Sequence, residues 1–197
     1  MIKNFPKIES PFIRKGEPYL VTPEIDPDFE WVFKDEGVLA IDKIDGTNVG
    51  IQIKDSKIVY AQNRANPKSL LNIKATRWDW ALLEGLNSAI QKNWLQDFSD
   101  GVYYGELVGP IINANRHQLD KHYWAPFKYL KEKCAWRSWE NHKYPKTFKA
   151  INEWFKDGLF SLFTRRMTDK TISAEGLVFY HPSGKMAKLR RDMFDWF

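Results

Sequence analysis

Short apolar runs bounded by turn residues occupy the first half of the chain and predict strands. Residues 37–41 form a continuous apolar run, and residues 49–54 and 57–60 alternate between apolar and polar positions on either side of a turn. Alternation with a period of two is typical of a strand that buries one face. We therefore expect the three runs to form an antiparallel meander.

Two longer segments carry apolar residues at helical spacing instead. Residues 68–95 show an apolar stripe that includes Trp78, Trp80 and Trp94, and residues 145–163 show a second one. Apolar positions that recur every three to four residues mark the buried face of an amphipathic helix. We expect both segments to be helices, with the tryptophans of the first packed in the core rather than binding a ligand.

The remaining segments complete a mixed pattern of strands and helices. Residues 6–30 are rich in proline and charge and predict an extended entry, residues 101–110 predict a strand closed by Gly-Pro, and residues 175–190 predict a hairpin. Because the elements do not alternate regularly as βαβ units, the fold class we expect is α+β, with antiparallel sheets flanked by helices. No linker or repeat interrupts the chain, so we expect a single domain over residues 1–197.

The composition is that of a globular protein. Hydrophobic residues make up 43% and aromatic residues 15% of the 197 positions, which excludes a disordered chain. The formal net charge of +5 permits a polyanionic partner such as a nucleic acid without requiring one. Charge alone therefore leaves the class of partner open.

Cysteine usage and the absence of long apolar runs indicate where the protein acts. Cys134 is the single cysteine, so the chain has no intrachain disulfide and no cysteine-based zinc cluster, as in a reducing compartment. No apolar run reaches the length of about 18 residues that a membrane span needs, and the first residues lack the apolar segment of a signal peptide. We expect a cytoplasmic protein without a membrane partner.

The candidate chemistry begins with the segment Lys43-Ile44-Asp45-Gly46-Thr47-Asn48. It lies between two predicted strands, which would hold the lysine at a fixed place, and Gly46 would let the backbone approach a ligand closely. A lysine is a covalent nucleophile only when its amine is neutral, so a catalytic lysine has to be buried or close to other cations. The alternative is a surface turn in which Lys43 lies beside its aspartate.

Two further signals follow at a distance in the sequence. The first is the run Tyr104-Gly105-Glu106, and the second is Glu175 at the start of the predicted hairpin, whose return arm carries Lys188 and Arg190. Residues two apart on a strand share a face, so Lys188 and Arg190 point the same way. Two cations on one face, across a hairpin from a carboxylate, would form a clamp for phosphates and a divalent ion. The alternative is an ordinary amphipathic edge.

In order and spacing, these signals resemble the motif set of the covalent nucleotidyltransferases, which comprise DNA ligases, RNA ligases and mRNA capping enzymes. Residues 43–48 look like motif I, Glu106 looks like motif III, Glu175 looks like motif IV, and residues 188–190 look like motif V. The resemblance covers most of the chain, from about Trp31 to its end.

Within this superfamily the sequence is similar to the RNA-sealing branches. Asn48 stands at a position where DNA ligases and capping enzymes usually carry arginine, whereas RNA-sealing enzymes often carry asparagine. The stretches 105–110 and 187–194 also resemble phage and bacterial RNA ligases. The family that the sequence resembles is therefore the ATP-dependent RNA ligases.

The resemblance implies a covalent mechanism in which Lys43 attacks the α-phosphorus of ATP and forms a lysyl-AMP phosphoramidate. Glu175 would help to hold Mg²⁺ or Mn²⁺ through water, and Lys188 and Arg190 would neutralise the phosphates. Arg190 stands where a second lysine is common in the family, a change that keeps the charge but alters the geometry.

The resemblance also implies which residues bind the nucleotide. Asn48 and Arg64 would contact the ribose or the phosphate, and Glu106 would accept hydrogen bonds from the ribose hydroxyls. An aromatic residue downstream of the motif III glutamate normally stacks on adenine in this family. Trp124 and Phe127 are the candidates here, and a place in the core is the alternative for each.

The implied function is that of an ATP-dependent RNA ligase, whose substrate is RNA with 5′-phosphate and 3′-hydroxyl ends. The chain stops nine residues after Lys188, without the OB-fold or other C-terminal domain that ligases generally carry. We therefore expect self-adenylylation, or sealing of an already adenylylated end, unless an accessory protein or domain acts in trans. Two alternatives stay open: a transferase of the same fold that uses GTP or seals DNA, and a non-catalytic RNA-binding module.

Overall fold

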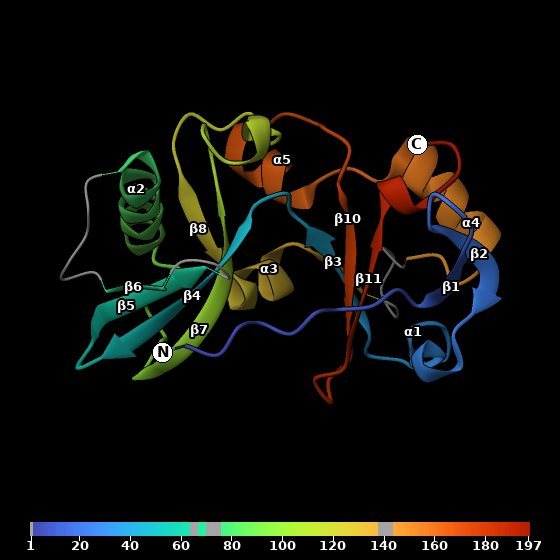
Figure 1. Ribbon diagram of the computed structural model, residues 1–197, viewed down its shortest axis with the longest axis horizontal. Helices are drawn as coiled ribbons and strands as arrows, with labels where there is room; N and C mark the ends of the chain where they lie inside the picture. Colours follow the sequence, from blue (N-terminus) through green and yellow to red (C-terminus); the bar gives the residue numbers. More distant parts are fainter. Residues whose placement is uncertain (1, 64–66, 70–75, 138–143) are drawn as a thin grey trace. The chain divides into compact units, whose positions relative to one another are not determined.

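The computed structural model describes residues 2–63, 67–69, 76–137 and 144–197. The chain divides into two compact units, each formed by two stretches of sequence: unit 1 contains Met1–Pro6 and Asp45–Leu130, and unit 2 contains Lys7–Ile44 and Lys131–Phe197 (Figure 1). Both units contain antiparallel sheets accompanied by helices, so the α+β class predicted from the sequence is confirmed.

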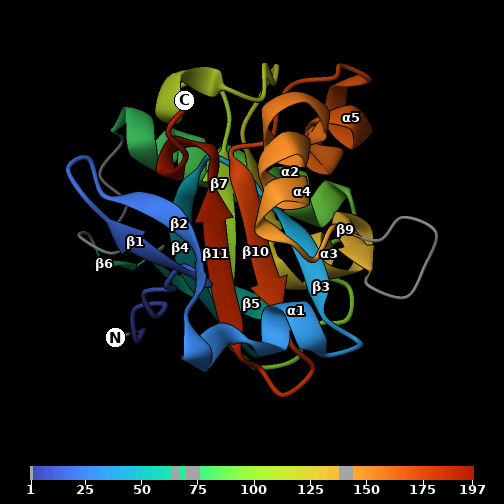
Figure 2. The same ribbon diagram turned by 90° about the vertical axis from the view of Figure 1, so that its right-hand side faces the viewer.

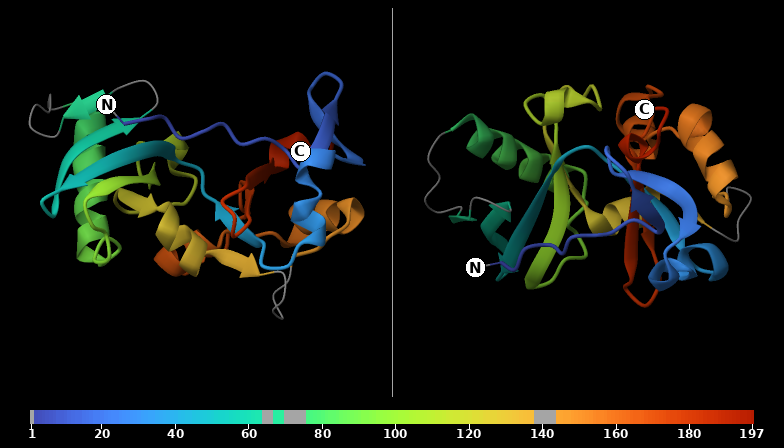
Figure 3. Two further views of the ribbon diagram at one scale, coloured as in Figure 1. Left: turned by 90° about the horizontal axis from the view of Figure 1, so that it is seen from below. Right: turned by 45° about the vertical axis from the view of Figure 1, so that its right-hand side comes forward.

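Unit 1 is a five-stranded antiparallel sheet with a long helix against one face. In spatial order its strands are β6 (Pro67–Ser69), β5 (Lys57–Asn63), β4 (Thr47–Lys54), β7 (Gly101–Val108) and β8 (Tyr123–Pro126). Helix α2 (Arg77–Gln91) begins at a capping box, in which the side chains of Thr76 and Asp79 each bond the other's backbone N–H. Figure 3 shows the helix, in green, beside the strands of this sheet. The helix joins a core that contains Leu82, Leu86 and Trp124.

Unit 2 contains a four-stranded antiparallel sheet and a separate hairpin. The sheet runs in the order β11 (Met186–Arg190), β10 (Gly176–Tyr180), β3 (Leu39–Lys43) and β9 (Ala135–Arg137), and Figure 2 shows β11, β10 and β3 side by side. The hairpin consists of β1 (Phe12–Lys15) and β2 (Leu20–Ile25). Leu177, Phe179 and Leu189 are fully buried on one face of the sheet and form a core with Phe155.

The helical segments of the chain other than α2 are short. They are α1 (Trp31–Lys34), α3 (Phe127–Lys133), α4 (Phe148–Glu153) and α5 (Leu162–Thr168), with 3₁₀ turns at Pro27–Phe29, Asn113–Asn115 and Arg191–Met193 and a π-helical turn at Trp154–Gly158. Within the part of the chain that the structure describes, no helix has the length and apolar character needed to cross a bilayer.

The predicted meander is wrong in its pairing, although its three strands exist. β4 and β5 pair with each other, but β3 belongs to the other sheet, where it lies between β10 and β9. Alternation with a period of two predicts that a segment is a strand. It does not predict which strand it pairs with, because pairing depends on hydrogen bonds to distant segments. The entry over residues 6–30 likewise contains a hairpin that its prolines and charges did not indicate.

The two predicted helices are shorter than expected. Residues 67–69 form β6, and α2 begins only after Thr76, while residues 70–75 lie outside the described part. The 145–163 segment is interrupted. Phe160 forms an isolated antiparallel β-bridge with Ser173, and Ser161 then caps the separate helix α5. Trp80 is 60% exposed, so the expectation that the tryptophan stripe packs in the core fails at this residue.

Candidate active site

Three strands of unit 2 place Lys43 and Arg190 in one row. Gly176 of β10 pairs directly with Lys43 of β3 on one side and with Arg190 of β11 on the other. Directly paired residues of an antiparallel sheet point to the same face, so the lysine and the arginine flank a position that carries no side chain. Lys188, two residues before Arg190, lies on the same face, as the sequence predicted.

Strands β10 and β11 approach each other so closely at Gly176 that a side chain would not fit there. A Cβ atom there would lie 2.0 Å from the carbonyl oxygen of Leu189 and 2.8 Å from the Cα atom of Arg190. Both obstacles are backbone atoms, which cannot rotate away as the end of a side chain does. The glycine after Glu175 is therefore required by the approach of β11 to β10.

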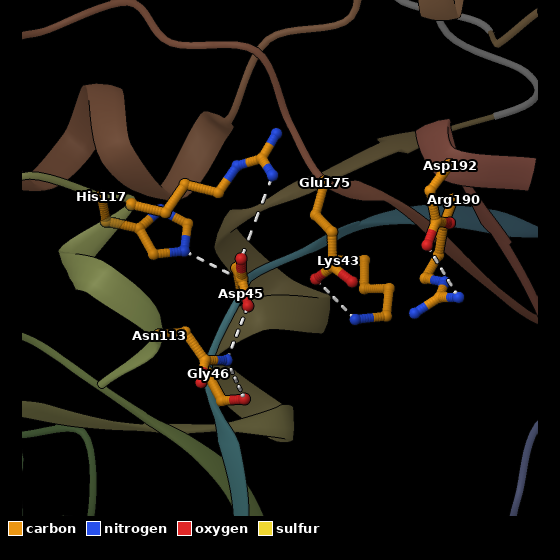
Figure 4. Close-up of polar contacts among 9 residues, drawn as sticks. Lys43, Asp45, Gly46, Asn113, His117, Glu175, Arg190 and Asp192 are labelled. Carbon is orange, nitrogen blue, oxygen red and sulfur yellow. Dashed lines mark hydrogen bonds and ion pairs between the residues drawn. The ribbon is translucent and has the colours of Figure 1, made fainter. Parts of the chain in front are cut away.

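Lys43 and Glu175 form an ion pair at the head of this row. The Nζ atom of Lys43 donates to the Oε2 atom of Glu175 at 2.6 Å, and the side chains are 23% and 16% exposed (Figure 4). Glu175 precedes β10 and is fixed by its own backbone, since its carbonyl oxygen accepts from the N–H of Arg191 at 2.9 Å. Lys43 thus lies at the end of a strand with most of its side chain buried, rather than exposed in a turn.

The cations of β11 lie in a partly buried, electropositive environment. Burial lowers the pKa of Lys188, and the neighbouring charges of Arg190 and Lys43 lower it further. Arg190 pairs with Asp192 at 2.9 Å, whereas its buried Nε atom has no hydrogen-bond acceptor among the described residues. A buried N–H without an acceptor is costly, and an anionic ligand would supply one.

Asp42, the residue before Lys43, is a charged group that the sequence analysis did not single out. It points to the opposite face of β3, where it is 1% exposed and its Oδ2 atom accepts from the hydroxyl of Ser161 at 2.7 Å and from the N–H of Phe163 at 2.9 Å. Burial raises the pKa of Asp42 to about 6, although both hydrogen bonds oppose the shift. It attaches β3 to the start of α5.

In unit 1, the sheet brings Asn48 and Glu106 together. They are directly paired residues of β4 and β7, so their side chains share one face. The amide nitrogen of Asn48 also donates to the carbonyl oxygen of Gly105 at 3.4 Å. Two residues 58 positions apart in the chain, each assigned to the nucleotide by the resemblance, are therefore neighbours.

The aromatic candidates have different surroundings. Trp124 pairs with Leu107, the residue after Glu106, and therefore faces the α2 side of the sheet, where it is 0% exposed and donates to the carbonyl oxygen of Val49 at 3.1 Å. The alternative of a core role thus describes Trp124. Phe127 is partly buried, with its ring 4.8 Å from that of Phe5.

Two other sequence expectations concern Arg64 and Gly46. Arg64 lies outside the described residues. The close approach predicted for Gly46 is made to strand β7 within the protein, since a Cβ atom would lie 2.7 Å from the carbonyl oxygen of Leu107. His117, a residue that the sequence analysis did not single out, accepts from the backbone N–H of Asp45 at 2.9 Å. No local sequence signal links residues 72 positions apart.

The described residues contain no group of three or more His, Cys, Asp or Glu side chains that could hold a metal ion directly. Glu175 offers carboxylate oxygens, the kind of donor that Mg²⁺ and Mn²⁺ prefer, and one of them is engaged by Lys43. This set fits an ion that keeps most of its water shell and contacts the protein through water.

The comparisons with known proteins point to one family. A model of the RNA ligase family matches residues 37–194. No curated protein matches the sequence.

Solved structures of an RNA ligase from Naegleria gruberi have a similar fold. The structure with PPi has a TM-score of 0.53 and 17% identity, and the match covers 97% of this chain and 56% of that chain. A variant with AMP and Mn has a TM-score of 0.56 at 16% identity, with the same coverage. A variant with ATP and Mn has a TM-score of 0.53 at 17% identity, covering 96% and 56%. The chain thus spans a little over half the length of these ligases.

Proposed function

Because the chain belongs to the RNA ligase family, we propose that it is an ATP-dependent RNA ligase that carries AMP covalently on Lys43. The observation that carries the proposal is the row formed by Lys43, Gly176 and Arg190, with Glu175 2.6 Å from the lysine amine. A lysine that shares one face of a sheet with two cations supports the proposal that this lysine is the nucleophile. The Naegleria ligase structures with ATP or AMP and Mn support the choice of nucleotide and ion.

The first step would be the transfer of AMP to the enzyme. The Nζ atom of Lys43 attacks the α-phosphorus of ATP, a P–N bond forms, the bond to the bridging oxygen breaks, and pyrophosphate leaves. The amine must lose its proton before it can attack. The ion pair with Glu175 would therefore be the state before the attack, in which the amine still carries its proton.

Lys188 and Arg190 would neutralise the phosphates during this transfer. Both lie on the face of the sheet that carries Lys43, and the buried Nε–H of Arg190 would gain the acceptor that it lacks among the described groups. Cations that are already in position stabilise the negative charge that develops on the phosphate in the transition state. They lower the barrier because they do not have to move during the reaction. Glu175 would hold Mg²⁺ or Mn²⁺ through water, and the ion would supply further neutralisation of phosphate charge.

The nucleoside would be held by unit 1. Glu106 and Asn48, paired across β4 and β7, present an acceptor and a donor for the ribose hydroxyls. Arg64 is retained as a phosphate or ribose contact on the family resemblance alone. Phe127, with its partly exposed ring, is favoured over the buried Trp124 for stacking on adenine, because stacking needs an accessible face.

The later steps would join RNA ends. AMP passes from Lys43 to the 5′-phosphate of RNA, and the 3′-hydroxyl of a second end then attacks that phosphate and releases AMP. We also propose that residues 1–197 work as one adenylyltransferase domain and that the protein acts in the cytoplasm.

The test is incubation with Mg²⁺ and either ATP or GTP, followed by measurement of the intact mass. With ATP we expect the mass to increase by one AMP in the wild type and to stay unchanged in Lys43→Ala. Lys185→Ala, a change of an exposed lysine in the β10–β11 turn, is the matched control and should label like the wild type.

The same measurement separates the alternatives. Labelling by GTP alone would favour a capping-type transferase and contradict the RNA ligase proposal. No labelling by either nucleotide would favour a non-catalytic RNA-binding module.

A further inference from the structure

A loop distant in sequence binds the turn Asp45-Gly46. This loop consists of residues 109–119, between β7 and β8, and we name it the clamp loop. The amide nitrogen of Asn113 donates to the Oδ1 atom of Asp45 at 2.7 Å and to the carbonyl oxygen of Gly46 at 2.9 Å. The Nε2 atom of His117 accepts from the backbone N–H of Asp45 at 2.9 Å. Figure 4 shows both side chains directed at the turn.

These contacts bind both the backbone and the side chain of the turn. A backbone N–H can only donate, so the Nε2 atom of His117 is the acceptor and the ring is neutral, with its proton on Nδ1. Arg116, from the same loop, lies 4.0 Å from the Oδ2 atom of Asp45. The Asp45 N–H, the Asp45 carboxylate and the Gly46 carbonyl are therefore all held by one loop.

The clamp loop keeps a backbone conformation that most residues avoid. Asn113, Ala114, Asn115 and Gln118 have φ angles of 45°, 54°, 51° and 51°, in the left-handed region. The side chain of Asn115 stabilises this conformation by accepting from the N–H of Leu119 and donating to its carbonyl oxygen, both at 2.9 Å. Strain that is concentrated in one loop beside a candidate site points to a functional constraint.

The start of the clamp loop is anchored to β8. Gly109, with a φ angle of 139°, packs so closely on His122 that a Cβ atom would lie 2.7 Å from its Cα atom. The Nε2 atom of His122 accepts from the N–H of Ile111 at 3.3 Å, and its Nδ1 atom contacts Glu84 of α2. The loop therefore projects from a fixed base in the sheet and its helix.

We propose that Asn113 and His117 are positioning residues for the adenylylation of Lys43, an inference that rests on the proposed function. Neither is assigned to the nucleotide. They act by fixing the backbone two residues after the nucleophile, so that the amine keeps the direction needed for in-line attack. A displacement of the nucleophile by about 1 Å can cost about 100-fold in rate, so the loss of this restraint would slow the chemical step rather than weaken ATP binding.

The test is single-turnover formation of lysyl-AMP at varied ATP concentration, with Asn113→Ala and His117→Leu. We expect the maximal rate to fall by about 10-fold to 100-fold, while the half-saturating ATP concentration changes by less than about 3-fold. His117→Gln, whose amide oxygen can replace Nε2 as the acceptor, should recover most of the rate. Lys185→Ala, at an exposed lysine in the β10–β11 turn away from the clamp loop, is the control and should react like the wild type.

A second measurement does not depend on activity. Hydrogen exchange at the Asp45 amide should accelerate in His117→Leu and return toward the wild-type rate in His117→Gln, because this N–H is the one that the imidazole binds. If the wild type forms no lysyl-AMP, the proposed function fails, and the exchange rates still decide whether the clamp restrains the turn. Unchanged exchange, an unchanged maximal rate, or a rate loss that His117→Gln does not recover would overturn the inference.

Discussion

At the scale of the residue, strand β3 separates two charged neighbours by pointing them to opposite faces. Lys43 lies on the face that carries Arg190 and Lys188, while Asp42 lies in the core against Ser161 and α5. The alternation of side chains along a strand makes this separation automatic once β3 is paired on both sides. The buried carboxylate attaches the strand that carries Lys43 to the start of α5.

Asp42→Asn should change how stability depends on pH. The pKa of Asp42 is about 6 in the folded protein and near 3.8 when unfolded, so the folded state binds more protons between these values and is destabilised as pH rises through them. The loss amounts to about 3 kcal/mol in the free energy of unfolding, at about 1.4 kcal/mol per pKa unit. Asparagine cannot ionise and keeps an acceptor for Ser161 and Phe163.

Thermal unfolding at pH 4.5 and pH 7.5 measures this effect. The Tm of Asp42→Asn relative to the wild type should be higher at pH 7.5 than at pH 4.5. Asp157→Asn, at an exposed aspartate, is the control and should shift the Tm equally at both values. If the Tm of Asp42→Asn relative to the wild type falls as pH rises, the assignment of Asp42 as a buried carboxyl group with a raised pKa is wrong.

At the scale of the element, β11 is an amphipathic strand whose two faces serve different purposes. Ala187 and Leu189 are buried in the core, and Lys188 and Arg190 occupy the opposite face. The same strand packs so closely on Gly176 that β10 admits no side chain there. The apolar residues of β11 thus pack in the core, and the pairing of β11 with β10 fixes where Lys188 and Arg190 lie on the other face.

Lys188→Ala and Arg190→Ala should impair lysine adenylylation without unfolding the protein. Each removes a cation from the face of Lys43 and leaves the core residues in place, so we expect the rate of AMP transfer to fall by about 10-fold or more. Initial rates of lysyl-AMP formation and the Tm of each variant provide the measurement. Lys185→Ala, three residues before Lys188 in the turn, is the control. Wild-type rates in both variants would remove β11 from the proposed mechanism.

At the scale of the whole molecule, the chain consists of two units and spans 56% of the length of the Naegleria ligase structures with PPi, AMP or ATP. The residues proposed for AMP transfer, Lys43, Glu175, Lys188 and Arg190, all belong to unit 2. Asn48 and Glu106 belong to unit 1.

Sealing should depend less on Lys43 when the RNA end already carries AMP. We expect the chain to join a 5′-adenylylated RNA to a 3′-hydroxyl RNA with Mg²⁺ and no ATP, and Lys43→Ala to retain this activity, because the lysine is needed only to load AMP. Gel separation of labelled RNA measures the product. An acceptor that ends in a 3′-deoxynucleotide is the control. Joining of 5′-phosphate RNA with ATP, but not of adenylylated RNA, would contradict this order of steps.

The sequence by itself determined the family and selected the residues that we propose for the chemistry. Lys43, Glu106, Glu175 and Lys188 occur in the order and spacing of known motifs, and the alternation of residues 185–190 correctly placed Lys188 and Arg190 on one face. These features can be read from the sequence because strand periodicity and short motifs depend only on residues close together in the chain. The same local information predicted the α+β class.

Only the tertiary structure decided which residues meet. β3 pairs with β10 rather than β4, which brings Lys43 and Arg190 to either side of Gly176, and Asn113 and His117 reach Asp45 from 68 and 72 positions away. Trp124 is buried because its register with Leu107 turns it toward α2. Strand partners, registers and loop contacts depend on hydrogen bonds and burial between distant segments, and local periodicity does not specify them.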